Sequence, residues 1–196
     1  MLQIRIHGRG GQGVVSAAEM LSLAAFEQGR HAQAFPSFGS ERTGAPVVAF
    51  CRIAEHDIRL REPILEPDVL IVQDPTLLHQ VDVFQGLKRD GWVLINSRHD
   101  FAALGLAEIA QRHRRERLST VPATEIALRH LGRPLPNAVL LGGFAALTGL
   151  ITLAAVAHAI GCRFSGQLAA ANAAAAAEAH RFVQREMEDL AHAQAD

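Results

Sequence analysis

A run of glycines close to the start of the chain constrains its fold more than any other feature. The segment HGRGGQG, residues 7–13, places glycines at 8, 10 and 13 in the spacing G-x-G-x-x-G. The preceding Gln3–His7 is short and alternating, as in a strand, and Val14–Gln28 carries apolar residues at helical spacing before Gly29. Strand, glycine turn and helix in this order open a nucleotide-binding α/β unit, in which the helix N-terminus faces an anion.

The residue that would complete a nicotinamide site does not follow. In such a unit an acidic side chain about 20 residues further on, at the end of the second strand, holds the ribose hydroxyls. Here the second predicted strand, Ala32–Phe35, ends at Pro36, while Glu27 lies in the helix and Glu41 in the next loop. Three interpretations stay open. The first, which the sequence favours, is that the turn binds a phosphate-bearing ligand. The second is that its glycines only let strand and helix pack closely. The third is that the chain itself binds a nicotinamide or a flavin.

Strand-like and helix-like segments alternate up to residue 132, and the chain is helix-like beyond it. We therefore expect one α/β domain over 1–196, with a mostly parallel sheet and a Rossmann-like opening in about 1–132 and a helical part in about 133–196. The Ala173–Ala177 run predicts a tightly packed or end-capping helix. The further predicted strands are Ala45–Ile53, Ile58–Leu60, Asp68–Asp74, Trp92–Asn96 and Leu118–Val121. The further predicted helices are a short one starting at Asp74-Pro75, Phe101–Arg115, Thr124–Leu131, Ala138–Thr148, Leu153–Ile160 and Ser165–Leu190.

Composition excludes several classes of function. Hydrophobic residues make up 49% of the 196 residues and the formal net charge is −1, so nothing in the charge suggests nucleic acid or a membrane surface as a partner. The two cysteines, Cys51 and Cys162, are too few for a four-cysteine iron–sulfur cluster or a structural zinc. The ten histidines show no metal-ligand spacing, and no Ser-His-Asp or Cys-His set can be argued. Without a recognisable signal peptide or membrane span, we expect a cytoplasmic protein.

A second loop, PSFGSERTG over residues 36–44, carries hydroxyl side chains, a carboxylate and an arginine immediately before a predicted buried strand. Loops at strand ends of an α/β sheet face the same crevice, so we expect this loop beside the glycine turn. There, Arg42 could pair with a phosphate or a carboxylate. The alternative is that Glu41 and Arg42 are ordinary solvated charges of a turn.

Several polar residues beside predicted elements are candidates for a structural or a functional role. Asp74 ends a strand before Pro75, which favours a helix N-cap over a residue that orients a neighbouring loop or a partner subunit. Asn96-Ser97 has the same ambiguity after the next strand. Asn137 is expected to be an N-cap as well. His7 directly precedes the glycine turn, where it could reach a ligand.

Several separated segments together resemble one protein family. They are HGRGGQG, QAFPSFGSERTGAPVVAFCRI, EPDVLIVQDPTLL, LINS and LGRPLPNAVLLGGFAALTGL, and they run in order from about residue 3 to residue 165. They resemble the gamma subunit of the pyruvate (or 2-ketoisovalerate) ferredoxin oxidoreductases, a domain that is fused into one long chain in other members. Several motifs in order are far more specific than one glycine turn.

The resemblance implies a complex that oxidatively decarboxylates a 2-oxo acid to its acyl-CoA and passes electrons to ferredoxin or NAD. Thiamine diphosphate with Mg and the 4Fe-4S clusters then belong to the thiamine-binding and iron–sulfur subunits, and none is held by this chain alone. The chain itself would be a non-catalytic subunit, without a catalytic residue or metal ligand, that shapes the coenzyme A side of the site. Its helical C-terminal third and the loop Phe35–Phe38 are expected to contact the sister subunits.

The resemblance also points to binding residues, for which backbone N–H groups and Arg42 would suit the 3′-phosphate and diphosphate of coenzyme A. The candidates are Gly8, Gly10, Gly11, Gln12 and Gly13 in the turn, and Ser40, Glu41, Arg42, Thr43 and Gly44 in the loop. Gamma subunits of the family often have an arginine where Thr43 stands and a bulkier residue in place of Ser37, so this loop has one cation fewer. Two alternatives remain: a self-contained Rossmann-type nicotinamide or flavin oxidoreductase, and a purely structural scaffold subunit.

Overall fold

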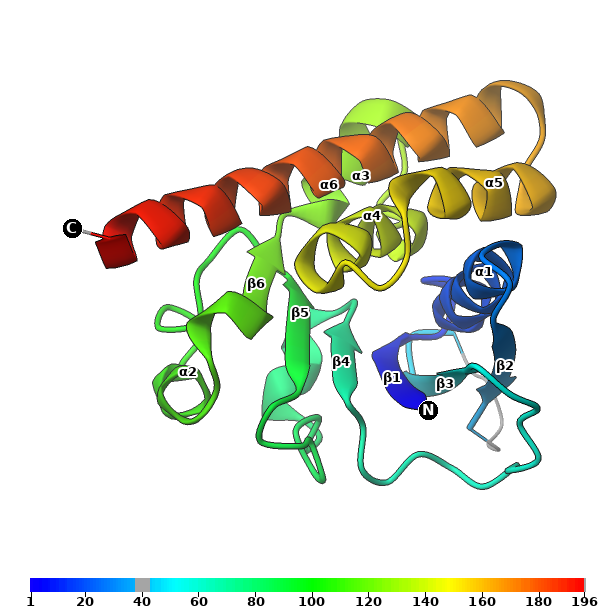
Figure 1. The fold of residues 1–196 in the computed structure, drawn as a ribbon. Helices are drawn as coiled ribbons and strands as arrows, with labels where there is room; N and C mark the ends of the chain where they lie inside the picture. The colour runs from blue at the N-terminus through cyan, green and yellow to red at the C-terminus, as the bar shows by residue number, and fades with distance from the viewer. Residues whose placement is uncertain (38–42, 196) are drawn as a thin grey trace.

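The computed structural model describes residues 1–37 and 43–195, which form a six-stranded sheet covered by helices (Figure 1). The strands are β1 (Leu2–Arg9), β2 (His31–Pro36), β3 (Pro46–Ala54), β4 (Val69–Val72), β5 (Trp92–Asn96) and β6 (Leu118–Val121). Their order in the sheet is β2-β3-β1-β4-β5-β6. Strands β1, β4, β5 and β6 are parallel neighbours, whereas β3 lies antiparallel between β1 and β2. The predicted α/β fold with a mostly parallel sheet is confirmed, with β3 as the exception.

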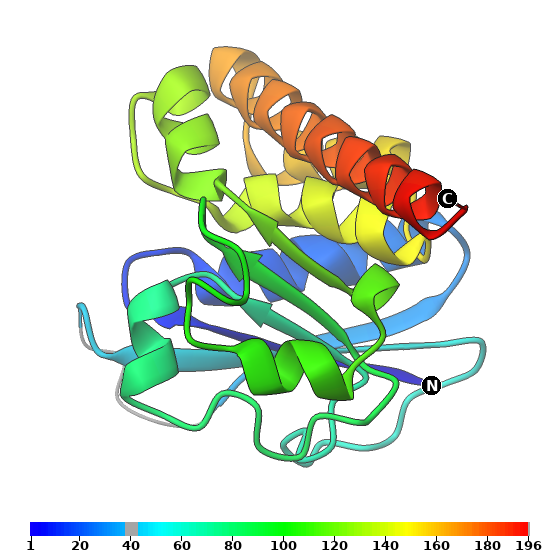
Figure 2. The same ribbon diagram turned by 90° about the vertical axis from the view of Figure 1, so that its left-hand side faces the viewer.

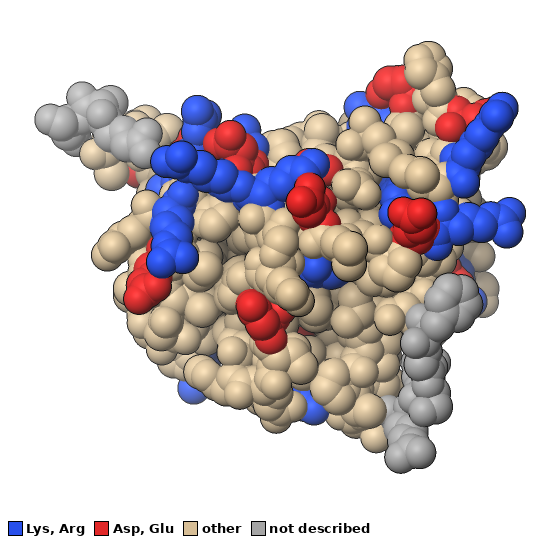
Figure 3. Space-filling view, turned by 90° about the horizontal axis from the view of Figure 1, so that it is seen from below, with Lys and Arg blue, Asp and Glu red and all other residues tan. Residues whose placement is uncertain are grey.

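The larger helices all lie on one face of the sheet (Figures 1 and 2). The helices are α1 (Val14–Glu27), η1 (Pro75–His79), α2 (Ala107–Arg112), η2 (Arg115–Arg117), α3 (Ala123–Leu131), α4 (Asn137–Thr148), α5 (Leu153–Arg163) and α6 (Gly166–Ala195). Helices α1 and α4 pack directly on the sheet, and α5 and α6 pack on top of them. The opposite face carries loops and the short helix α2, and its Lys and Arg side chains lie mostly in the upper half of the view in Figure 3, interspersed with Asp and Glu.

One hydrophobic core joins the sheet part to the helical part. Ile6 of β1, Leu21 of α1, Leu94 of β5 and Phe144 of α4 are fully buried in the same cluster. Helix α4 is buried along almost its whole length because the sheet lies below it and α6 above it. A helix in that position needs an apolar surface all round, which explains why its sequence is uniformly apolar rather than amphipathic.

Helices α4 and α6 come especially close to each other at Gly142. An ideal Cβ built on Gly142 would lie 1.9 Å from the backbone oxygen of Ala176, so only glycine fits there. The facing stretch of α6 is the alanine run, in which Ala175 and Ala176 are fully buried. Small side chains on both helices allow this close contact, which confirms the predicted tight packing of the alanine run.

Two predicted elements are wrong. Ile58–Leu60 is not a strand, because the backbone oxygens of Leu60 and Glu62 accept hydrogen bonds from the Arg52 guanidinium rather than from a neighbouring strand. The long helix predicted over residues 101–115 is reduced to α2. It is preceded by turns in which Asp100 caps Ala103 N and Gly105 has a φ of +74°, a left-handed conformation that ends helical structure.

Candidate functional site

The glycine turn joins the end of β1 to the start of α1, and two of its glycines are required by close packing. A Cβ on Gly8 would lie 2.6 Å from Val14 Cγ2. A Cβ on Gly13 would lie 2.4 Å from Asn137 Nδ2, and Gly13 also has a φ of +70°. Gly11 has a φ of +93° with open space around it. The close-packing interpretation therefore accounts for Gly8 and Gly13, while Gly11 faces outward into the space beside the turn.

The structure brings the glycine turn and the end of the second loop together. Gly10 N donates to Ala45 O over 2.9 Å, Gly44 N donates to Gly10 O over 3.1 Å, and Gly10 forms an isolated bridge with Thr43. The side chain of Arg9 adds a bond to Gly44 O of 3.0 Å. Thr43 and Gly44 thus lie beside the turn as expected. The predicted loop residues Ser40, Glu41 and Arg42 lie outside the described residues.

A hydrogen-bonded network fixes the turn to the end of β4. Gln12 Oε1 accepts from Arg9 N (2.8 Å) and Gln12 Nε2 donates to Asp74 Oδ2 (2.8 Å). Asp74 accepts from Thr76 N (3.0 Å), so it is the predicted N-cap of η1, and Arg9 Nε lies 3.2 Å from its carboxylate. Burial alone would raise the pKa of Asp74, but the hydrogen bonds from Thr76 and Gln12 and the charge of Arg9 outweigh it and hold the pKa below its usual value.

A cavity of about 500 Å³ opens beside the turn, between α1 and the helical part. Gly11 and Gly13 line one side, and Arg133 and Arg163 contribute positive charge; none of the described lining residues is acidic. Helix α1 begins here without a side-chain cap and without an acidic residue in its first turn. Unpaired N–H groups at a helix start, together with arginines, make the cavity suitable for a phosphate or carboxylate.

The sequence did not point to Arg133 and Arg163 as site residues. Arg133 follows α3 and Arg163 ends α5, so both are far in sequence from the turn that they face. The prediction that Asn137 is an N-cap is wrong: it is the first residue of α4, it is buried, and no side-chain cap is formed. Its amide lies against the turn instead, with Nδ2 3.5 Å from Gly13 O. The segment GRPLPN, residues 132–137, therefore supplies part of the cavity wall.

His7 and Asn96 are structural in the described part of the chain. His7 is 7% exposed and does not line the cavity beside the turn. Burial and the nearby charge of Arg5 lower its pKa to about 4, so it is neutral at physiological pH. Asn96 Nδ2 donates to Gln73 O and to Thr124 Oγ1, each over 2.7 Å, and Asn96 Oδ1 accepts from Thr124 N. Asn96 thus holds β4 and the start of α3 together.

The strand order argues against a self-contained nicotinamide site. In a Rossmann sheet the strand that carries the ribose-binding acid lies next to the first strand. In this chain β3 occupies that place and runs antiparallel, with Pro46 opposite Arg9. The carboxyl end of β2 is displaced by one strand from the glycine turn, so no acidic residue of the described chain stands at the ribose position.

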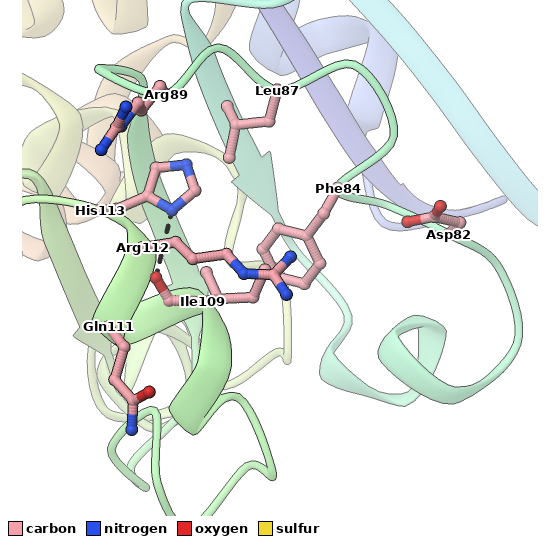
Figure 4. A pocket seen from close by; sticks show the side chains of 8 residues that line it. All are labelled: Asp82, Phe84, Leu87, Arg89, Ile109, Gln111, Arg112 and His113. Carbon is pink, nitrogen blue, oxygen red and sulfur yellow. Dashed lines mark hydrogen bonds between the residues drawn. The ribbon is translucent and has the colours of Figure 1, made fainter.

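A second hollow of about 690 Å³ lies away from the glycine turn, between α2 and the segment that precedes β5 (Figure 4). Phe84, Leu87 and Ile109 form apolar walls, and Arg89 and Arg112 stand at its rim. None of the candidate binding residues that the structure describes lines this hollow. Of these two cavities, the first is the one in which arginine side chains and the glycine turn meet, and the candidate site is therefore assigned to it.

A comparison with known protein families identifies the family of this chain. Residues 3–182 match the family model of the pyruvate ferredoxin/flavodoxin oxidoreductases. The chain belongs to this family. The resemblance inferred from the separated sequence segments is thereby confirmed, and those segments include the glycine turn and the GRPLPN wall of the cavity.

Relatives within the family are similar over nearly their whole length. The chain is 48% identical over 186 residues to the common gamma subunit of the pyruvate/ketoisovalerate oxidoreductases of Pyrococcus abyssi, covering 94% of this chain and 98% of the relative. It is 52% identical over 160 residues to pyruvate synthase subunit PorC of Methanosarcina barkeri, covering 82% and 85%. It is thus a gamma subunit of a pyruvate/2-oxoacid ferredoxin oxidoreductase complex, and the other subunits of that complex are its partners.

Solved structures agree with this assignment. The crystal structure of pyruvate oxidoreductase subunit PORC from Thermotoga maritima matches with a TM-score of 0.76 and 36% identity, covering 92% of this chain and 95% of that one. The fold also matches 2-oxoglutarate:ferredoxin oxidoreductase from Magnetococcus marinus, with a TM-score of 0.74 and 18% identity; the match covers 94% of this chain and 31% of that longer chain. The gamma fold therefore occurs both as a separate subunit and as a part of a longer polypeptide.

Neither a metal site nor a membrane span is found in the described residues of this gamma subunit. No group of three or more His, Cys, Asp or Glu side chains within residues 1–37 and 43–195 is arranged to hold a metal ion. Cys51 is buried in β3 and Cys162 is exposed on α5, and both are free thiols. Among the same residues, no helix is long and apolar enough to cross a membrane.

Proposed function

We propose that this gamma subunit binds coenzyme A in the cavity beside the glycine turn and forms the coenzyme A side of the complex's active site. The complex would convert a 2-oxo acid to its acyl-CoA and carbon dioxide and pass electrons to ferredoxin or NAD. The observation that carries the proposal is the meeting of the uncapped start of α1 with Arg133 and Arg163 in one cavity. Coenzyme A carries a diphosphate and a 3′-phosphate, and both suit such donors.

The apolar part of the cavity fits the rest of the ligand. Leu131, Leu135, Phe164 and Leu168 are apolar residues of its lining. A ligand site of several hundred cubic ångströms usually combines such an apolar lining with a few placed polar groups. An adenine ring has apolar faces, so it would pack against these side chains while the phosphates face the arginines. A fold relative, the 2-oxoglutarate enzyme of Magnetococcus marinus, has been determined with coenzyme A and succinyl-CoA bound.

The cofactors of the reaction are proposed to belong to the other subunits. The described residues of this chain contain no metal-ligand group, and the two cysteines are separated on β3 and α5, so they do not fit a four-cysteine cluster. Thiamine diphosphate, when bound in the complex, would supply the electron sink for decarboxylation. This chain's own contribution would be to bind and orient coenzyme A. We therefore name no nucleophile, general base or metal ligand within it.

Steady-state kinetics of the assembled complex test this proposal. Replacing both Arg133 and Arg163 with alanine should raise the apparent KM for coenzyme A at least about tenfold, because a hydrogen bond to a charged group contributes roughly 1.5–3 kcal/mol. The KM for the 2-oxo acid should stay unchanged. Arg181→Ala is the matched control, since Arg181 is exposed on α6 and does not line the cavity. An unchanged KM for coenzyme A in the double variant would instead support the scaffold alternative.

A further inference from the structure

We infer that the two arginines of the cavity recognise different phosphate groups of coenzyme A, Arg163 the diphosphate and Arg133 the ribose 3′-phosphate. The inference rests on the proposed function and adds which part of the ligand each arginine binds. It makes Arg133 a specificity-determining residue, because only that arginine would distinguish coenzyme A from its 3′-dephospho form.

Arg163 stands over the first turn of α1. Its Nη2 donates to Ser16 Oγ over 3.2 Å, and Ser16 is the third residue of that helix. The guanidinium group is therefore held next to the unpaired N–H groups of the helix start and next to Gly11 and Gly13. In nucleotide-binding α/β units the diphosphate lies at the glycine turn and the helix N-terminus. A diphosphate in that place would lie within reach of Arg163.

Arg133 reaches the same cavity from a different element. It follows Gly132, the residue that ends α3, and it is exposed at the cavity rim. Within residues 1–37 and 43–195, its side chain forms no hydrogen bond or ion pair. Its guanidinium group is thus available to a ligand, whereas that of Arg163 is already fixed over the helix. Arginine binds the fork of oxygens on a phosphate group with two parallel hydrogen bonds.

The apolar residues link the two phosphate positions. Leu131 and Leu135 flank Arg133 in the sequence, and Phe164 follows Arg163, and all three line the cavity. An adenosine that packs against these side chains would direct its diphosphate toward the glycine turn and its 3′-phosphate toward the rim. Because the 3′-phosphate is a monoester that carries nearly two negative charges at neutral pH, an arginine at the rim would bind it strongly.

The comparison of coenzyme A with 3′-dephospho-CoA in the assembled complex tests the assignment. The KM for each is measured for the natural complex and for the Arg133→Ala, Arg163→Ala and Arg181→Ala variants. The natural complex should prefer coenzyme A by about tenfold or more. Arg133→Ala should abolish this preference by raising the KM for coenzyme A alone. Arg163→Ala should raise both KM values by the same factor and keep the preference, and Arg181→Ala should change neither.

The outcomes separate this inference from the proposed function. If Arg133→Ala raises both KM values equally, or if Arg163→Ala is the change that removes the preference, the assignment is overturned while coenzyme A binding at the cavity stands. If Arg133→Ala leaves both KM values unchanged but the double variant weakens coenzyme A, the assignment is again overturned. If the double variant changes neither KM, the proposed function itself fails. Unaltered thermal unfolding of the variants shows that the effects do not come from misfolding.

Discussion

The side chain of Gln12 donates a hydrogen bond to Asp74 Oδ2 over 2.8 Å and thereby joins the glycine turn to the end of the neighbouring parallel strand β4. The same carboxylate caps η1 and pairs with Arg9, whose side chain also holds the second loop at Gly44. The Asp74 carboxylate thus fixes the positions of the glycine turn, the start of η1 and, through Arg9, the second loop relative to one another. The geometry of the candidate site depends on it.

Asp74→Ala should lower the free energy of unfolding by about 1–3 kcal/mol, because it removes a helix cap, the acceptor of the Gln12 Nε2 hydrogen bond and the ion pair with Arg9. Asp74→Asn should cost less, since an asparagine oxygen can still accept the hydrogen bond from Thr76 N. Urea unfolding of the isolated subunit measures both. Asp90→Asn is the control, because Asp90 is exposed before β5 and its ion pair is with the equally exposed Arg114. Equal stability of Asp74→Ala and the natural protein would contradict the role of this network.

Gly142→Ala should destabilise the protein by about 2–3 kcal/mol, because the new methyl group overlaps the backbone of Ala176 and forces α4 and α6 apart. Gly161→Ala is a matched control in helix α5. A Cβ there meets nothing within 4 Å, and alanine favours helix over glycine by about 0.8–1 kcal/mol. Calorimetry should show a lower melting temperature for the first variant and an equal or higher one for the second. An unchanged melting temperature of the Gly142→Ala variant would mean that α4 and α6 are not in such close contact.

We also expect a single unfolding transition in these measurements, because the sheet and the helical part share one core. Residues 1–132 and 133–196 would then unfold together, as one cooperative domain. Two separate transitions, of which Gly142→Ala moved only the one that reports on the helical part, would show that the two parts fold independently.

Gly13→Ala should be costly for two reasons that a double variant can separate. A left-handed residue other than glycine costs about 1–2 kcal/mol, and the added Cβ also meets Asn137 Nδ2 at 2.4 Å. In an Asn137→Ala background the second cost disappears, so Gly13→Ala should cost less there than in the natural protein. Additive effects in the double-mutant cycle would show that Asn137 does not pack on the turn.

The free energy of unfolding should depend on pH in part through the titration of His7. Its pKa is lowered from 6.5 to about 4 in the folded state, so protons bind the unfolded chain more readily between these values. The contribution of neutral His7 to the free energy of unfolding is fully present above pH 6.5 and is lost as the pH falls toward 4, by about 3 kcal/mol in all. His7→Gln has no such titration. The difference in unfolding free energy between the natural protein and His7→Gln should therefore shrink over this range, and a constant difference would refute the assignment.

Local patterns in the sequence were sufficient to predict most of the fold. The glycine turn, the buried runs at β4 and β5 and the apolar α4 follow from spacing and composition alone. The antiparallel insertion of β3 between β1 and β2 does not, because neighbour order depends on the whole sheet. The wrong strand at Ile58–Leu60 has a similar cause: the Arg52 guanidinium satisfies carbonyl groups that a pattern assigns to a partner strand.

The candidate site was predictable only in part. The turn has a spacing with a known mechanism, so it could be recognised from sequence. Arg133 and Arg163 stand at the ends of α3 and α5, where an arginine usually is a solvated charge. Only the packing of the helical part over α1 brings them to the turn. The same packing gives Asn137 its place against Gly13 instead of a cap.

Direct binding of coenzyme A to the assembled complex tests the central claim most directly. Titration calorimetry of the natural complex and of the Arg133→Ala/Arg163→Ala complex gives the two dissociation constants without any catalytic step. We predict that the double variant binds coenzyme A at least about tenfold more weakly, while Arg181→Ala binds it as the natural complex does. Equal dissociation constants for all three complexes would contradict the account, because the cavity beside the glycine turn would then not be the coenzyme A site.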